Sequence, residues 1–264
     1  MPESVPRERD ARFFLACVGI GLLAGLLSGL FGVGGGTVIV PLLVLALAFD
    51  QRLAAGTSLA AIVPTATVGV VSYALHDAVA WIPALLLAAG AVAGAQFGTW
   101  LLPRLSITFL RWAFVGFLVL VIVSLFLVIP SRDAMLELTL LSGLGLVVLG
   151  VITGTVAGLI GVGGGIIVVP ALVVLFGTSD LVAKGTSLLM MIPTAISGTI
   201  GNLRRGNVDL VSAAAVGIAA CTTTALGAWI ATLVDPFLGN MLFAVFLVFI
   251  ATQMAIKAIR GRAR

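Results

Sequence analysis

Long apolar stretches, nearly free of charged residues, dominate the pattern of hydrophobic and polar positions along the chain. They cover residues 13–31, 79–102, 107–129, 138–160, 210–234 and 236–256. Each is long enough to cross a bilayer, because a membrane-spanning helix needs roughly 20 apolar residues. A transmembrane β-barrel would instead need short strands that alternate apolar and polar residues, whereas these stretches are continuous. The pattern therefore predicts an all-α polytopic membrane protein.

The apolar pattern also repeats along the chain with a constant shift. GLFGVGGGTVIVPL at 29–42 is matched by GLIGVGGGIIVVPA at 158–171, and AGTSL at 55–59 is matched by KGTSL at 184–188, in each case 129 residues later. A shift that needs no gap indicates two homologous halves, the internal symmetry found in many membrane-protein folds.

Proline and charged residues interrupt the apolar pattern between the two halves. The predicted organisation is a first transmembrane repeat, a connecting loop, a second transmembrane repeat and two cytoplasmic tails, at 13–129, 130–137, 138–257, and 1–12 with 258–264. We expect about four crossings per half and about eight in all. An odd number per half would make the repeats inverted, and the sequence leaves both arrangements open.

Each half also contains an apolar segment, 37–49 or 166–177, that is too short to cross a membrane. At a rise of 1.5 Å per residue these segments reach only about 20 Å, against a hydrocarbon core of about 30 Å. We therefore expect half-helices or broken helices near the glycine clusters, re-entrant or kinked within the membrane.

Composition and charge agree with a membrane location. Of the 264 residues, 61% are hydrophobic and 9% are charged, and the mean hydropathy is +1.28. Soluble proteins have about 25% charged residues, so we expect a multi-pass protein of the cell inner (plasma) membrane, in contact with the lipid bilayer. Lysine and arginine in 257–264 and at 204–205 predict that both termini are cytoplasmic.

The sequence GVGGG, at 32–36 and 161–165, interrupts an apolar stretch in each half. Glycine allows positive φ and the close approach of a ligand, and a glycine-rich turn before a helix leaves N–H groups at the positive end of the helix dipole. The clusters therefore predict an anion-binding site, unless the glycines only let helices pack closely. The candidate residues are Gly32, Gly34, Gly35, Gly36, Gly161, Gly163, Gly164 and Gly165.

The glycine clusters do not match a nucleotide-binding motif. The fingerprint G-x-G-x-x-G needs glycine where Thr37 and Ile166 stand, and no lysine follows either cluster as a Walker motif requires. The chain shows no catalytic triad or metal-ligand spacing, and we expect Cys17 and Cys221 to be packed free thiols. We therefore expect no enzyme activity, no cofactor, no metal and no nucleic-acid partner.

A second repeated motif, GTS, stands at 56–58 and 185–187. Thr or Ser before an apolar run is typical of a helix N-cap, so the motif predicts the start of a helix. These hydroxyls either cap the helix alone or also bind an oxyanion, which adds Thr57, Ser58, Thr186 and Ser187 to the candidate site. Proline follows in each half and removes a backbone hydrogen bond. The candidate hinge residues are Pro64, Thr65, Pro193 and Thr194.

Few ionisable residues lie near these motifs. Lys184 directly precedes the second GTS motif, and a cation there would favour an anionic ligand. Its counterpart in the first half is Ala55, so the site would be charged on one side only. We expect Arg52 at a membrane interface. His76 is either an ordinary surface or structural residue or part of a proton relay.

The doubled pattern G-x-x-x-G-L-[FI]-G-V-G-G-G, ending in proline and followed by GTS, resembles the TauE/SafE family of membrane transporters, also called the sulfite exporter or toluene-sulfonate uptake permease family. The resemblance covers about residues 13 to 257. It implies proton-coupled secondary transport of a small sulfur-containing anion, such as sulfite or an organosulfonate. An anion channel, an uptake permease for another small carboxylate or sulfonate, and a membrane-embedded enzyme or assembly factor are the alternatives, and a homodimer is left open.

Overall fold

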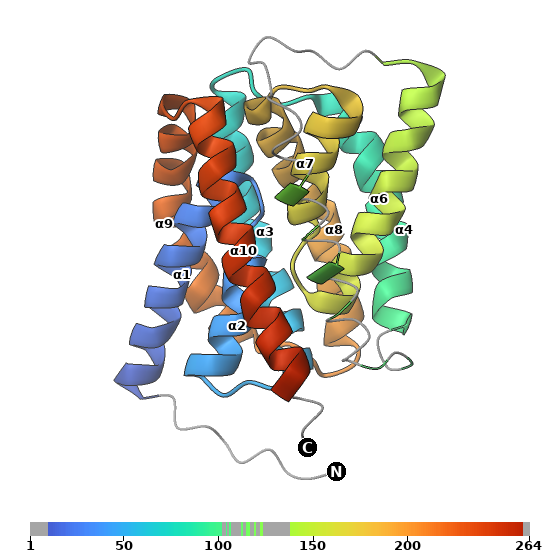
Figure 1. The fold of residues 1–264 in the computed structure, drawn as a ribbon. Coiled ribbons are helices and arrows are strands. Elements are labelled where there is room, and N and C mark those ends of the chain that lie inside the picture. Colours follow the sequence, from blue (N-terminus) through green and yellow to red (C-terminus); the bar gives the residue numbers. More distant parts are fainter. Residues whose placement is uncertain are drawn as a thin grey trace.

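The computed structural model is an all-helical bundle (Figure 1). It describes residues 10–101 and 138–260 and, between them, positions 104, 106, 112, 115, 116, 119, 122 and 123. Most of the predicted span 107–129, the connecting loop 130–137 and most of the two tails lie outside the described residues. The helices are α1 Ala11–Phe31, α2 Gly36–Ala46, α3 Gln51–Ala74, α4 Trp81–Leu101, α6 Leu140–Ile160, α7 Gly165–Phe176, α8 Asp180–Leu203, α9 Leu210–Leu233 and α10 Pro236–Arg260.

Six of the described helices are long and apolar enough to cross a membrane: α1, α3, α4, α6, α8 and α9. The two helices that follow the glycine clusters, α2 and α7, have only 11 and 12 residues. The prediction of an all-α, multi-pass membrane protein with two short apolar helices is therefore confirmed. The total of about eight crossings stays a prediction.

The helices of the second half begin 129 residues after those of the first. Helices α1 to α4 begin at residues 11, 36, 51 and 81, and α6 to α9 begin at 140, 165, 180 and 210. The corresponding helices α3 and α8 pack antiparallel, because Gly69 lies against Leu188 and Gly198 lies against Leu59. These two helices, which correspond under the 129-residue shift, therefore run in opposite directions, as inverted repeats would require. Helix α1 begins and α10 ends at the same end of the molecule (Figure 1).

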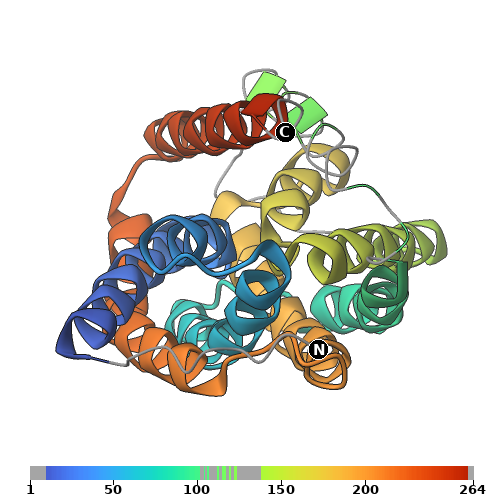
Figure 2. The same ribbon diagram turned by 90° about the horizontal axis from the view of Figure 1, so that it is seen from below.

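The first helix of each half packs against the fourth helix of the other half. Helix α1 lies beside α9, and α6 lies beside α4 (Figure 2). Glycines at every fourth position let the backbones approach closely, as small residues do in membrane helices. Gly21, Gly25 and Gly29 face the carbonyls of Val216, Ala220 and Thr224, and Gly150, Gly154 and Gly158 face those of Leu87, Ala91 and Ala95. For these glycines close packing is the role that the structure supports.

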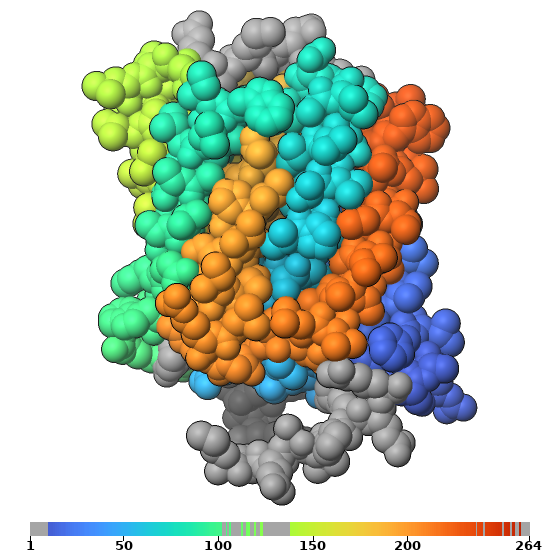
Figure 3. Space-filling view, turned by 180° about the vertical axis from the view of Figure 1, so that it is seen from behind, coloured from blue at the N-terminus to red at the C-terminus, as the bar shows by residue number. Residues whose placement is uncertain are grey.

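Helices α3 and α8 lie side by side at the middle of one face, flanked by α9 and α4 (Figure 3). Both central helices supply buried side chains to the main hydrophobic cluster, including Leu59, Ile62, Leu188 and Met191. The outer helices instead expose large apolar side chains, as expected of a surface that faces lipid. Examples are Leu15, Leu85, Leu140, Leu141, Ile218 and Val245. Cys17 and Cys221 are free thiols, as predicted.

Replacing Gly25 by Ala should destabilise the protein. A Cβ at Gly25 would clash with the carbonyl oxygen of Ala220 and lie 2.5 Å from Oγ1 of Thr223, and overpacking of this kind costs about 1–3 kcal/mol. Gly19 on the same helix has nothing within 4 Å of such a Cβ. Gly19→Ala should therefore be neutral or stabilising, since Ala favours a helix by about 1 kcal/mol over Gly. Thermal unfolding of the purified variants tests this, and equal melting temperatures would contradict it.

Candidate functional site

Each glycine cluster forms a left-handed turn between two helices. Gly32 ends α1 with φ 68°, and Gly34 and Gly35 follow with φ 71° and 74° before α2 begins at Gly36. The second cluster repeats this conformation, with φ between 80° and 84° at Gly161, Gly163 and Gly164. Three left-handed residues among four strongly favour glycine, because a Cβ makes this region unfavourable.

The two glycine turns meet inside the protein. A Cβ at Gly36 would lie 2.9 Å from the carbonyl oxygen of Gly161, and a Cβ at Gly165 would lie 2.8 Å from that of Gly32. All residues of 32–36 and 161–165 are buried. The irregular backbone is therefore enclosed by protein, as it must be within a hydrocarbon layer that offers no hydrogen-bond partners.

The beginnings of α2 and α7 lie at this contact between the turns. Their N-caps, Gly35 and Gly164, make no side-chain capping hydrogen bond. The first N–H groups of a helix have no partner within the helix and carry its positive partial charge. Helices α2 and α7 extend away from the contact toward opposite ends of the molecule (Figure 1). The arrangement thus brings two positive helix ends together in the interior, which is favourable for an anion.

Two equivalent apolar side chains, Ile62 of α3 and Met191 of α8, fill the space beside the turns. A Cβ at Gly36 would lie 2.8 Å from Cδ1 of Ile62, and a Cβ at Gly165 would lie 2.9 Å from Sδ of Met191. Both side chains are fully buried. A ligand that reaches the helix ends must therefore displace at least one of them.

Three buried hydroxyls, those of Ser28, Thr37 and Ser58, have no hydrogen-bond partner. Ser28 lies in the last turn of α1 and Thr37 in the first turn of α2, so these two residues flank the glycine turn. An unpaired buried hydroxyl is costly, and each can donate a hydrogen bond to an anion. The first two were not among the sequence candidates, and their equivalents in the second half are Ala157 and Ile166.

The prediction that GTS begins a helix is wrong. Helix α3 begins at Gln51 after the N-cap Asp50, and α8 begins at Asp180 after the N-cap Ser179. The capping side chains stand several residues before each motif, so both motifs lie inside their helices. Their amides therefore belong to continuous helices and are not free to hold an anion.

The GTS threonines instead bind loops of the opposite half. Thr57 Oγ1 accepts a hydrogen bond of 3.0 Å from the N–H of Asp209, and Thr186 Oγ1 accepts one of 3.0 Å from that of Ala80. The preceding glycines make room for these loops, because Gly56 faces the carbonyl oxygen of Asn207 and Gly185 faces that of Ala78. Ser187 makes only a weak contact of 3.9 Å with Sδ of Met191.

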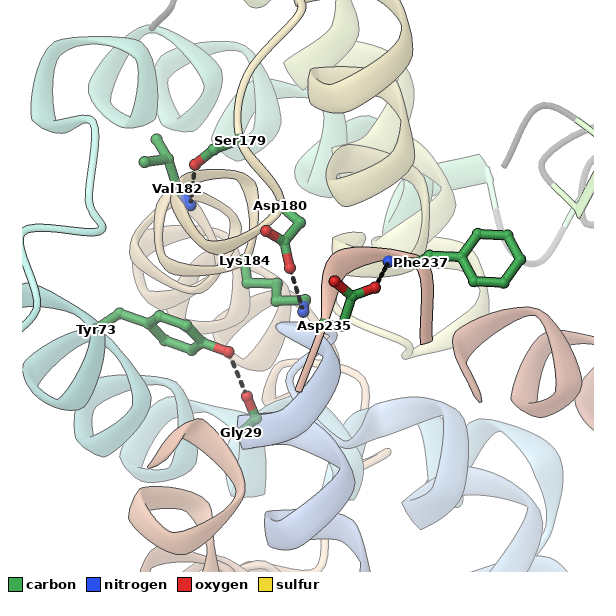
Figure 4. A network of polar contacts seen from close by, with 8 residues as sticks. All are labelled: Gly29, Tyr73, Ser179, Asp180, Val182, Lys184, Asp235 and Phe237. Atoms are coloured by element: carbon green, nitrogen blue, oxygen red, sulfur yellow. Dashed lines mark hydrogen bonds and ion pairs between the residues drawn. The ribbon is translucent and has the colours of Figure 1, made fainter. Parts of the chain in front are cut away.

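Lys184 is buried beside the first glycine turn. A Cβ at Gly32 would lie 2.5 Å from Cα of Lys184. The Lys184 ammonium forms an ion pair of 3.1 Å with Oδ2 of Asp180 one turn earlier (Figure 4). Sequence reasoning missed Asp180, although the spacing D-x-x-x-K in a helix is the signal for such a pair. Arg52, by contrast, is exposed.

The remaining candidates have simple surroundings. Pro64 and Pro193 lie inside α3 and α8, which continue through them. Thr65 and Thr194 donate hydrogen bonds to the carbonyl oxygens four residues earlier, a bond that often bends a helix; their hinge role stays a prediction. His76 is exposed. The described residues contain no group of three His, Cys, Asp or Glu side chains that could hold a metal.

Two short apolar helices within a bundle of long apolar helices are typical of multi-pass membrane proteins, among them secondary transporters. The chain belongs to the sulfite exporter TauE/SafE family, whose model matches residues 2–125 and 146–264.

Three relatives are named as probable membrane transporter proteins. YunE of Bacillus subtilis strain 168 is 37% identical over 120 residues, which are 43% of this chain and 44% of YunE. YdhB of the same strain is 28% identical over 193 residues, or 72% of the chain and 78% of YdhB. A protein of Xylella fastidiosa strain Temecula1 is 34% identical over 105 residues, 40% of each chain. The match thus spans less than half the length of YunE and of the Xylella protein. No solved structure matches the chain.

Replacing Thr186 by Val should destabilise the protein, because the N–H of Ala80 would lose its partner at a cost of about 1–3 kcal/mol. Thr186→Ser keeps the hydroxyl and should restore stability. Thr67→Val is the control, since that exposed hydroxyl bonds only to its own helix at Val63. Unfolding of the purified protein measures all three. A Thr186→Val variant as stable as the wild type would contradict a stabilising role for this hydrogen bond.

Proposed function

We propose that this protein is a secondary transporter for small sulfur-containing anions, sulfite or organosulfonates, that works by proton-coupled alternating access in the cell inner membrane with both termini cytoplasmic. The observation that carries the proposal is the meeting of the α2 and α7 N-termini inside the bundle. The anion would bind at these helix ends, among the two glycine turns, the hydroxyls of Ser28, Thr37 and Ser58, and Lys184.

The polar groups at this place suit an anion of one or two charges. Desolvating such an anion costs several kcal/mol even after relaxation, so it needs several compensating hydrogen bonds and positive charge. Two helix N-termini supply N–H groups and roughly half a positive charge each. Unpartnered hydroxyls add donors, and the three oxygens of a sulfite or sulfonate group offer enough acceptors for them. A neutral or cationic solute would gain nothing from these dipoles.

Inverted halves give a simple route to alternating access. If the two halves exchange conformations, a site between them opens to the opposite side of the membrane. Helices α3 and α8 lie at the centre of the contact, each with an internal proline, and they carry Ile62 and Met191 beside the glycine turns. We assign these two side chains as the apolar parts that close the site from either direction.

Flux of isotope-labelled anions into proteoliposomes tests the function. The panel is sulfite, sulfoacetate, toluenesulfonate, acetate and chloride. Saturable uptake of one or more of the sulfur-containing anions, driven by an inward proton gradient, is expected. Non-saturating flux with single-channel conductance would favour an anion channel, and absence of any saturable sulfite or sulfonate flux would refute the proposal.

Replacing Gly164 by Ala should weaken transport selectively. A Cβ at φ 84° strains the second glycine turn and would lie 3.2 Å from the carbonyl oxygen of Thr153. This strain should move a backbone N–H of the turn away from the anion. Losing one hydrogen bond to a charged ligand costs about 1.5–3 kcal/mol, or roughly tenfold to a hundredfold in apparent affinity. Gly177→Ala is the matched control, because Gly177 also has positive φ, 64°, but has nothing within 4 Å. Equal flux in both variants would indicate that the glycines of the turns only allow close packing and do not bind the anion.

Replacing Lys184 by Ala should raise the KM for sulfite or an organosulfonate by about tenfold or more, because a charge-assisted hydrogen bond is lost. Arg52→Ala should have a much smaller effect, since Arg52 is exposed. Both are measured in proteoliposomes at matched protein content. Equal, mild effects would leave the anion to backbone amides and hydroxyls alone.

A further inference from the structure

The partner of Lys184 is a carboxylate that is only half satisfied. Asp180 lies in the first turn of α8 with 4% of its surface exposed. Its Oδ2 atom pairs with Lys184, whereas Oδ1 is buried and has no hydrogen-bond partner. The hydroxyl of Thr178, two residues earlier, is also buried without a partner. The unpartnered Oδ1 atom of Asp180 can therefore accept a proton.

Charged and titratable groups from three elements surround the pair in the described part of the chain (Figure 4). Asp180 and Lys184 belong to α8. From α3, the hydroxyl of Tyr73 donates a 2.6 Å hydrogen bond to the carbonyl oxygen of Gly29 at the end of α1. From the start of α10, the Asp235 carboxylate accepts a 2.9 Å bond from the N–H of Phe237. Gly239 lies in the first turn of α10, and a Cβ at this residue would lie 4.0 Å from Nζ of Lys184.

An anion cannot use Lys184 while Asp180 keeps its charge, except at a high electrostatic cost. Two negative charges would then share one ammonium in a buried place, where water screens their repulsion poorly. The cost disappears if Asp180 takes a proton as the anion arrives. The anion then replaces the carboxylate beside Lys184. The summed charge of Lys184, the protonated Asp180 and a monovalent anion equals that of the original ion pair.

We propose that Asp180 is the proton-coupling residue, which competes with the transported anion for Lys184 and binds one proton from solvent when the anion displaces it. This rests on the proposed function, because the anion is the substrate named there. No covalent bond forms or breaks other than the O–H bond of the Asp180 carboxyl. The first half has Gln51 and Ala55 at the positions equivalent to Asp180 and Lys184. Of these two pairs of positions, only the pair in the second half can form an ion pair.

Toluenesulfonate is a suitable probe, because its charge does not change between acidic and neutral pH. Its binding to the wild-type protein should strengthen as the pH falls, by up to about tenfold per unit of pH. In Asp180→Asn the pH dependence should vanish, and uptake should proceed without proton movement. Asp77→Asn is the control, since Asp77 is an exposed carboxylate in the α3–α4 loop, and it should keep the wild-type slope.

Two further measurements protect the test against misfolding of the single variant. Asp180→Asn combined with Lys184→Gln removes both charges together, which buried ion pairs tolerate better than loss of one partner; its binding should be weak and independent of pH. The detergent-solubilised wild-type protein in weak buffer should take up about one proton per toluenesulfonate bound, as linkage requires.

The outcomes separate the two proposals. Toluenesulfonate binding without proton uptake, or an unchanged pH slope in Asp180→Asn, would overturn the role of Asp180 and leave anion transport intact. If neither toluenesulfonate nor sulfite gives saturable binding or flux in the wild type, the proposed function itself fails.

Discussion

A helix that ends inside a membrane protein leaves N–H and C=O groups without partners, and in hydrocarbon each such group costs several kcal/mol. The rest of the structure follows from the need to enclose four such ends, those of α1, α2, α6 and α7. The glycine turns bring these ends into contact with one another, α3 and α8 contribute Ile62 and Met191 beside them, and α1 with α9 and α6 with α4 complete the enclosure.

The same requirement explains why the halves depend on each other. Each half places its own first helix on the fourth helix of the other, and each GTS threonine holds a loop of the other half. Neither half has a complete set of backbone partners alone. Reciprocal contacts of this kind are compatible with alternating access, because the two halves could exchange conformations and still make the same contacts.

Buried polar side chains are distributed between the two halves much less symmetrically than the backbone conformation is. The glycine turns have matching φ angles in both halves, but the unpartnered Ser28 and Thr37 flank only the first turn. The buried pair of Asp180 and Lys184 lies beside that same turn, from the second half. Two similar backbones thus carry different buried polar side chains around the glycine turns. A buried ion pair contributes little net stability after desolvation, which makes a functional reason for this pair the more useful hypothesis.

The sequence by itself determined the glycine turns and most of the long helices, but not where α3 and α8 begin. Apolar runs predict α1, α4, α6 and α9 because lipid sets their length, and GVGGG predicts left-handed turns because only glycine adopts them without strain. Tertiary structure decided what the motifs touch. Local propensity predicts Thr57 and Thr186 as caps, yet Asp50 and Ser179 cap those helices. The two threonines instead bind loops 152 and 106 residues away, respectively. Burial of Asp180 beside Lys184, the inverted direction of α3 and α8, and the contact between the glycine turns also depend on packing between distant segments, which a local pattern does not encode.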